Sequence, residues 1–146
     1  MDIRLVREPF DPAMLLNDFC RSHGESGGIV SFIGQVRPDG EVNALELRHY
    51  GPLTLPDMRN LGRRARDRWG LDGVLIAHRT GTMLPGEAIV FVAAAGSHRR
   101  EAFLAADFMM DHLKSAAWFW KREKIGDVWR WVEPRPQDYS DLQRWV

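Results

Sequence analysis

The nine residues AIVFVAAAG (88–96) are apolar enough to form the central strand of a sheet. Ser97 follows them and can act as the N-cap of the longest helix that the sequence predicts. Within this helix, apolar residues recur at alternating steps of three and four, which is the spacing of one helical face. These residues are Phe103, Ala106, Met110, Leu113, Ala117 and Trp120. We expect this face to pack into the core.

The rest of the chain alternates between helical and strand patterns, without a linker or a repeat. The pattern predicts a helix over 12–23 with Asp11 as its cap, and a second helix from Pro56 to about Trp69. Hairpin-length turns between strand pairs favour mostly antiparallel sheets over a doubly wound parallel sheet. A length of 146 residues indicates a single α+β domain over 1–146. Further strands are predicted at 29–37, 42–50, 74–83 and 128–133.

Lysine is rare in this sequence and is confined to one stretch. Seventeen of the 20 basic residues are Arg, whereas Lys114, Lys121 and Lys124 lie within eleven residues. On a continuous helix, Lys114 and Lys121 would project only about 20° apart, at the edge of the apolar face. Mutual repulsion and partial burial both lower lysine pKa values, which is how a lysine becomes a base or a nucleophile. Alternatively, both side chains extend along the rim of the core to reach solvent.

The segment SHRRE (97–101) opens the same helix and is suited to binding an anion. Backbone N–H groups at a helix start favour an anion, and His98, Arg99 and Arg100 add donors for phosphate or carboxylate. On a continuous helix, Arg99 and Lys121 would be separated by roughly 33 Å of axial rise. The two ends would then serve different pockets, or one pocket shared across a dimer.

Charge, cysteine content and spacing exclude several classes of protein. The 20 basic residues balance 20 acidic ones, so no global field recruits nucleic acid or an acidic membrane. The single Cys20 cannot form an intrachain disulfide, and we expect it to be a small buried hydrophobe. His49 and His112 lack ligand-like spacing with Cys20, so no metal site is expected. The charged N-terminus and the absence of an apolar run of roughly 20 residues predict a soluble cytoplasmic protein.

Three further features have two interpretations each. The arginine-rich helix at 56–69 could bind RNA, although its apolar stripe favours a solvated face. His78 and Arg79 form either a polar pair at a strand end or part of a site. Four tryptophans form either a stacking platform for a base or pterin, or core and interface contacts. They are Trp118, Trp120, Trp129 and Trp131.

These features leave two alternative functions open. One is a non-catalytic anion- or nucleotide-binding module, and the other is an RNA-binding domain.

Six segments occur in one order and cover nearly the whole chain. They are SFIGQVR (31–37), VNALELRHY (42–50), AHRTG (77–81), GSHRREAF (96–103), DHLKSAAWFWKRE (111–123) and WRWVEPR (129–135). Together they resemble the large, catalytic subunit family of molybdopterin synthase. The resemblance implies a fold similar to the α/β-hammerhead.

The resemblance also implies an activity and an assembly. Proteins of this family are sulfurtransferases of molybdenum cofactor biosynthesis that convert cyclic pyranopterin monophosphate into molybdopterin by adding two dithiolene sulfurs. The sulfur comes from the C-terminal thiocarboxylate of a small ubiquitin-like subunit with a Gly-Gly tail. A homodimer of the large subunit binds one small subunit at each end, which makes a heterotetramer. The resemblance implies no metal or cofactor in the large subunit.

The resemblance assigns roles to individual residues. Lys114 and Lys121 match the catalytic lysines, and His98 and Arg99 match a pair that reaches the pocket from the neighbouring subunit. The substrate-binding residues implied are Gln35, Val36, Arg37, His98, Arg99, Lys114, Lys121, Arg122, Glu123 and Arg135. The chain departs from the family where Ala117 and Trp118 replace a segment that commonly contains Pro. An unkinked helix at this point would move Lys121.

Overall fold

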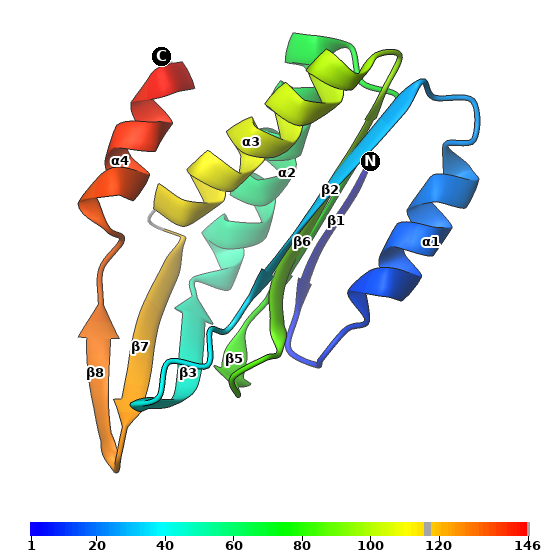
Figure 1. Cartoon of the computed structure of the whole chain (residues 1–146). Helices are drawn as coiled ribbons and strands as arrows, with labels where there is room; N and C mark the ends of the chain where they lie inside the picture. Colours follow the sequence, from blue (N-terminus) through cyan, green and yellow to red (C-terminus); the bar gives the residue numbers. More distant parts are fainter. Residues whose placement is uncertain (116–117, 146) are drawn as a thin grey trace.

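The computed structural model describes residues 1–115 and 118–145 as two four-stranded sheets with four α-helices (Figure 1). The first sheet has the strand order β1-β4-β6-β2, and only its β1–β4 pair is parallel. Figure 1 shows α1 on one side of this sheet, with α2 and α3 on the other. The strands are β1 (Asp2–Val6), β4 (Gly73–Arg79), β6 (Ala88–Gly96) and β2 (Gly28–Gln35). The helices are α1 (Pro12–Ser22), α2 (Gly51–Trp69) and α3 (Arg99–Ser115).

The second sheet is antiparallel throughout, with the order β5-β3-β7-β8. After this sheet, the chain forms the short helix α4, which packs against α3, and then a 3₁₀ turn. The elements are β5 (Gly81–Met83), β3 (Val42–His49), β7 (Phe119–Ile125), β8 (Val128–Val132), α4 (Pro136–Leu142) and the turn Gln143–Trp145. The prediction of an α+β fold with mostly antiparallel sheets is confirmed.

The strand β6 is central, as its composition predicts. It lies between β4 and β2, and its side chains alternate between two cores. Val90 and Val92 pack with α2 and α3, whereas Phe91 and Ala93 pack with α1. Both faces of this strand are covered by helices, which explains why it contains no charged residue.

Two predicted boundaries in the middle of the chain are wrong. The helix α2 begins at Gly51 rather than at Pro56, and Pro56 lies inside it. A proline there removes one backbone donor near the start of the helix, and the buried face of Met58 and Leu61 holds the remaining turns. The predicted strand 74–83 is two strands in different sheets, because Gly81, with φ of 84°, lets the chain change direction.

The longest predicted helix is also shorter than its apolar pattern indicates. The helix α3 ends at Ser115, and Trp120 and Lys121 lie on β7, while Ala117 lies outside the described residues. Hydrogen bonds to β3 and β8 satisfy the backbone of β7 on both sides, which overrides the helical spacing. Phe103, predicted to face the core, is 56% exposed.

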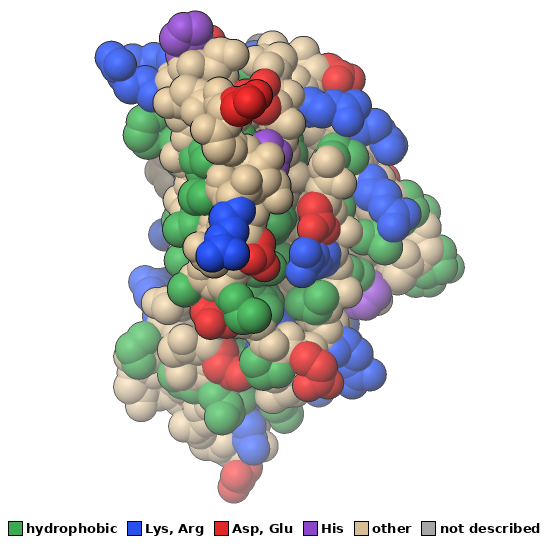
Figure 2. All heavy atoms as spheres, turned by 90° about the vertical axis from the view of Figure 1, so that its right-hand side faces the viewer, with side chains coloured by type: hydrophobic (Ala, Val, Ile, Leu, Met, Phe, Trp, Pro, Cys, Tyr) green, Lys and Arg blue, Asp and Glu red, His purple; other side chains and the backbone are tan. Residues whose placement is uncertain are grey.

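The surface in the described residues is mixed in charge. On the face that carries α1, basic and acidic side chains are interspersed rather than segregated (Figure 2). Cys20 on this helix is exposed, so the prediction that it is a buried hydrophobe is wrong. None of the helices in the described parts of the chain is long and apolar enough to cross a membrane.

Candidate active site

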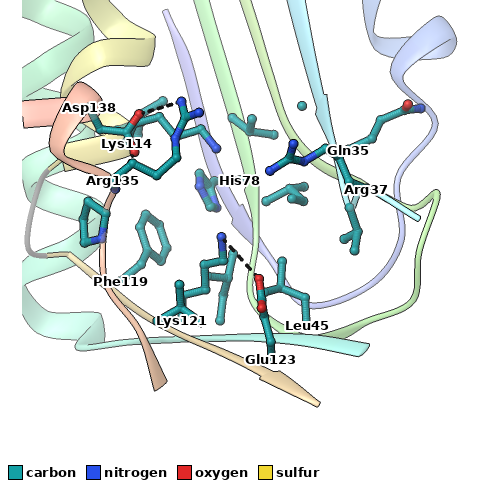
Figure 3. A pocket seen from close by; sticks show the side chains of 18 of the residues that line it. Gln35, Arg37, Leu45, His78, Lys114, Phe119, Lys121, Glu123, Arg135 and Asp138 are labelled. Carbon is teal, nitrogen blue, oxygen red and sulfur yellow. Dashed lines mark hydrogen bonds and ion pairs between the residues drawn. The ribbon is translucent and has the colours of Figure 1, made fainter. Parts of the chain in front are cut away.

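A cavity of about 690 Å³ lies where the two sheets meet, below the C-terminal end of α3 (Figure 3). Its walls come from β2, β3, β4, β6, β7, α3 and the segment that leads from β8 into α4. A volume of this size is typical of sites that hold a small molecule. The pocket is therefore assembled from segments that are far apart in the sequence.

The two lysines meet in this pocket, but from different elements. Lys114 lies in the last turn of α3, and Lys121 lies on β7. Strand alternation turns Lys121 and Glu123 toward the pocket and Arg122 toward the opposite face. The expectation that the lysines share a helical ridge is wrong, because one lies on a helix and the other on a strand, but both side chains line the same pocket.

The four cationic side chains of the pocket divide into two kinds. Lys121 lies 3.9 Å from Glu123, and Arg135 lies 3.2 Å from Asp138 (Figure 3). Neither Arg37 nor Lys114 has an ion-pair partner among residues 1–115 and 118–145. These two side chains can therefore bind a ligand anion without first breaking an internal ion pair.

The surroundings of Lys114 favour its neutral form. Although this residue is exposed over part of its surface, desolvation by the protein around its amine is the main cause that lowers its pKa. The charge of Lys121 lowers the pKa further, and Arg135 and Arg37 add to this effect against the opposing charge of Asp138. The pKa of Lys114 is therefore lower than that of an ordinary lysine, and its neutral amine forms more easily.

His78 also lies in the pocket, whereas its neighbour Arg79 does not. The Arg79 side chain is buried near the opposite face of β4, where its Nε donates to the Arg7 carbonyl oxygen at 3.1 Å. The His78 ring is buried and stacks on Phe119, with ring centroids 4.0 Å apart. The predicted polar pair is thus divided by strand alternation, and only His78 contributes to the pocket.

Most of the predicted site residues converge on this pocket, and three do not. The residues that line it are Gln35, Val36, Arg37, Lys114, Lys121, Glu123 and Arg135. His98 and Arg99 are exposed at the other end of α3, and Arg99 is about 22 Å along the helix axis from Lys114. Within one chain, the two ends of α3 therefore cannot contact the same small ligand.

Arg122 lies on the outer face of the second sheet. Its guanidinium donates to both carboxylate oxygens of Glu46, at 2.9 and 3.0 Å, and lies 4.4 Å from the ring centre of Trp129. This contact with Arg122 is the largest of the causes that hold the pKa of Glu46 below its ordinary value. Trp129 and Trp131 belong to this outer face, so they do not form a stacking platform in the pocket.

Replacing Arg122 by Gln is expected to lower the free energy of unfolding by about 1 kcal/mol, because a two-point contact with Glu46 is lost. Ligand binding is expected to stay unchanged, since the side chain is outside the pocket. Arg48→Gln is the matched control, because Arg48 contacts the same carboxylate but is 57% exposed. Chemical unfolding and a binding titration check both points, and a loss of binding in the Arg122 variant would contradict this assignment.

The pocket also contains residues that the sequence did not point to, including Met110, Phe119, Glu133 and Asp138. Phe119 could have been found from the alternation that places it on the same strand face as Lys121. No local signal marks Asp138. Within residues 1–115 and 118–145, no three His, Cys, Asp or Glu side chains come together as a metal ion requires.

Comparison with known proteins identifies a family whose sequence model matches this chain. A family model described as MoaE protein matches residues 5–116. The chain belongs to the MoaE family. A relative from Caulobacter vibrioides, named molybdopterin synthase catalytic subunit, is 45% identical over 146 residues, which cover 99% of this chain and 97% of the relative.

Solved structures of MoaE proteins share the fold. The MoaE protein from Burkholderia ambifaria aligns with a TM-score of 0.82 and 37% identity, over 99% of this chain and 98% of that chain. A complex of subunits 1 and 2 of molybdopterin-converting factor from Helicobacter pylori aligns with a TM-score of 0.80. That structure is 21% identical and covers 91% of each chain, so it supports the fold alone. The alignment with the Burkholderia ambifaria protein covers 99% of this chain, so it extends beyond residue 116 and includes the second sheet and α4.

Proposed function

We propose that this chain is the catalytic subunit of a molybdopterin synthase and a sulfurtransferase. In this reaction, sulfur passes from the C-terminal thiocarboxylate of a small ubiquitin-like subunit to cyclic pyranopterin monophosphate. The observation that carries the proposal is the convergence of Arg37 and Lys114, two cations without an ion pair among the described residues, in a pocket of a MoaE-family chain. The phosphate and the thiocarboxylate are both anions, and such cations attract them.

The two lysines take different parts in this reaction. Lys114 acts as an acid/base, or as the amine that transiently accepts the acyl group of the partner's C-terminus. Its lowered pKa supports both roles, because a general base and a nucleophile each require the neutral amine, which then becomes the acid once it has taken up a proton. Lys121 lowers that pKa by its charge and orients the substrate, held in place by its contact with Glu123 at 3.9 Å.

Arg37 and Arg135 bind the anionic groups of the ligand, and Gln35 and Val36 line the wall beside Arg37. The negative charge that develops on oxygen and sulfur during transfer is stabilised by the same cations. In this arrangement, the charged groups of the site are already in position when the substrate binds.

The assembly proposed is a homodimer that forms the core of a heterotetramer, located in the cytoplasm. His98 and Arg99 then serve the pocket of the neighbouring subunit. The distance of about 22 Å along α3 supports this arrangement, because it prevents the pair from reaching the pocket of its own chain. The C-terminal Gly-Gly tail of the small subunit enters beside Lys114.

A reconstitution tests this function. The protein is incubated with cyclic pyranopterin monophosphate and a thiocarboxylated ubiquitin-like subunit, and dithiolene formation is measured. The same subunit with an ordinary carboxylate is the control, because it binds but carries no sulfur. Sulfur incorporation that depends on the thiocarboxylate is expected. Salt-sensitive RNA affinity without turnover would instead favour a binding module that uses the arginine-rich face of α2.

A further inference from the structure

The pocket is divided into a buried floor and an exposed rim. The floor is mainly apolar, with Leu45, Leu47 and Val90 each no more than 6% exposed. The rim carries the cations Arg37 and Arg135, both of which are exposed. A ligand with one flat, uncharged half and one anionic half fits this division, with the flat half on the floor.

His78 brings a single polar group into this floor. Four polar side chains are buried in the described residues, and His78 is the one that lines the pocket, at 6% exposure. The other three are Thr54, Arg79 and Thr80. Figure 3 shows the His78 ring between the side chains of Lys114 and Lys121. The Nε2 atom of this ring is not among the fully buried polar atoms without a partner, so it is accessible to a ligand or to water at the pocket surface.

The hydrogen bonding of the ring determines what that nitrogen can do. Nδ1 lies 2.9 Å from the carbonyl oxygen of Arg79, and a carbonyl oxygen can only accept. Nδ1 therefore carries the proton in the neutral ring, which leaves a lone pair on Nε2. The pocket thus has an uncharged acceptor at its floor, whereas its rim is rich in donors.

The ring stays neutral across the range in which enzymes work. Burial is the main cause that lowers the pKa of His78 to about 4, and the charge of Lys114 lowers it further. The charged groups that line the same pocket around it are Lys114 of α3, Lys121 and Glu123 of β7, Arg37 after β2, and Arg135 and Asp138 near α4. The cations among them oppose a further positive charge at the floor.

Phe119 fixes the orientation of this acceptor. The two rings are nearly parallel, at 13°, with centroids 4.0 Å apart, so Phe119 covers one face of the imidazole. His78 comes from the first sheet and Phe119 from the second, so the stack joins the two sheets at the floor. With one face stacked and Nδ1 bonded, the edge that carries Nε2 is held in place before a ligand arrives.

We propose that His78 is a substrate-binding residue that accepts a hydrogen bond through Nε2 from a ring N–H of the heterocyclic half of the ligand. The flat heterocycle lies on the apolar floor, and the phosphate binds Arg37 and Lys114 at the rim. The choice of a pterin as the heterocycle rests on the proposed function, whereas the acceptor and its position rest on the geometry of the pocket.

Binding measurements without the small subunit test this assignment. The variant His78→Phe keeps a flat ring for the stack with Phe119 but removes the acceptor, and His78→Gln restores an acceptor without the ring. The probes are cyclic pyranopterin monophosphate, a phosphate-free reduced pterin and inorganic phosphate, each titrated by calorimetry. Arg37→Gln is the comparison variant for the rim, and thermal unfolding verifies that each variant is folded.

His78→Phe is expected to weaken binding of both pterins by about tenfold and to leave binding of inorganic phosphate unchanged. His78→Gln is expected to recover part of the pterin affinity, while Arg37→Gln weakens both phosphate-containing probes. Equal pterin affinity in the Phe variant and the wild type would overturn the proposal and make His78 a packing residue. Failure of the wild type to bind either pterin would overturn it too. Normal His78-dependent binding without sulfur transfer would overturn the proposed function alone.

Discussion

The variant Lys114→Arg is expected to lower the rate of dithiolene formation by roughly 10²- to 10⁴-fold, because an arginine stays protonated and cannot act as a neutral amine. The guanidinium keeps the positive charge of the rim, so binding of the anionic substrate is expected to change far less than the rate. Lys114→Ala is expected to lower both the rate of dithiolene formation and the affinity for the anionic substrate. Single-turnover rates and equilibrium binding, measured separately, distinguish charge attraction from chemistry.

Lys124→Arg provides the matched control for this prediction. Lys124 follows Arg122 on the opposite side of β7 from Lys121 and does not line the pocket, so this variant is expected to retain the wild-type rate. A rate near that of the wild type in Lys114→Arg would remove the neutral-amine role. The lysine would then act through its charge only.

The second large effect is a loss of stability in acid caused by His78. Its pKa is about 4 in the folded protein and about 6.5 when unfolded, so between these values the unfolded chain takes up a proton that the folded chain does not. The resulting loss in the free energy of unfolding is small above pH 6.5 and grows as the pH falls below this value. At pH 4 it is expected to reach about 3 kcal/mol of the free energy of unfolding.

Denaturant unfolding of the wild type and His78→Phe at pH 7 and pH 4 isolates this contribution. Other titrating groups are common to both proteins, so they cancel when the pH dependence of one is subtracted from that of the other. The Phe variant is expected to lose less stability between the two pH values by about 3 kcal/mol. Parallel curves for the two proteins would show that His78 titrates at an ordinary pKa.

Local patterns in the sequence predicted the core of the fold well. The continuous apolar run of β6 identified the central strand, and Asp11 identified the start of α1, where its side chain accepts from the Ala13 backbone N–H at 3.0 Å. Both signals act within a few residues, so they need no knowledge of the rest of the chain. The short strand β1 and the helix α4 were missed, because each is stabilised chiefly by contacts with distant segments.

Seven of the ten site residues that the resemblance implies line one pocket, whereas helical geometry placed Lys121 on the wrong element. The residues Lys114 and Lys121 do meet, yet the periodicity that placed them on one helix extended past Ser115 into a strand. Pairing with β3 and β8 decides the conformation there, and the apolar spacing contains no information about those partners. The contact between His78 and Phe119 is likewise formed by residues from different sheets, so no local pattern could reveal it.

The division of the strand 74–83 into β4 and β5 also bears on the chemistry. Thr80 alone separates the two strands. Its backbone N–H donates to the Val6 carbonyl oxygen at 2.9 Å, so a hydrogen bond to β1 holds the residue at which the chain passes from one sheet to the other. Lys114 is carried by a helix on the first sheet, and Lys121 is carried by the second. The distance between the two amines therefore depends on how the first sheet, with α3, is oriented relative to the second sheet. A substitution at Thr80 can change this orientation, and with it the reaction, without contacting the pocket.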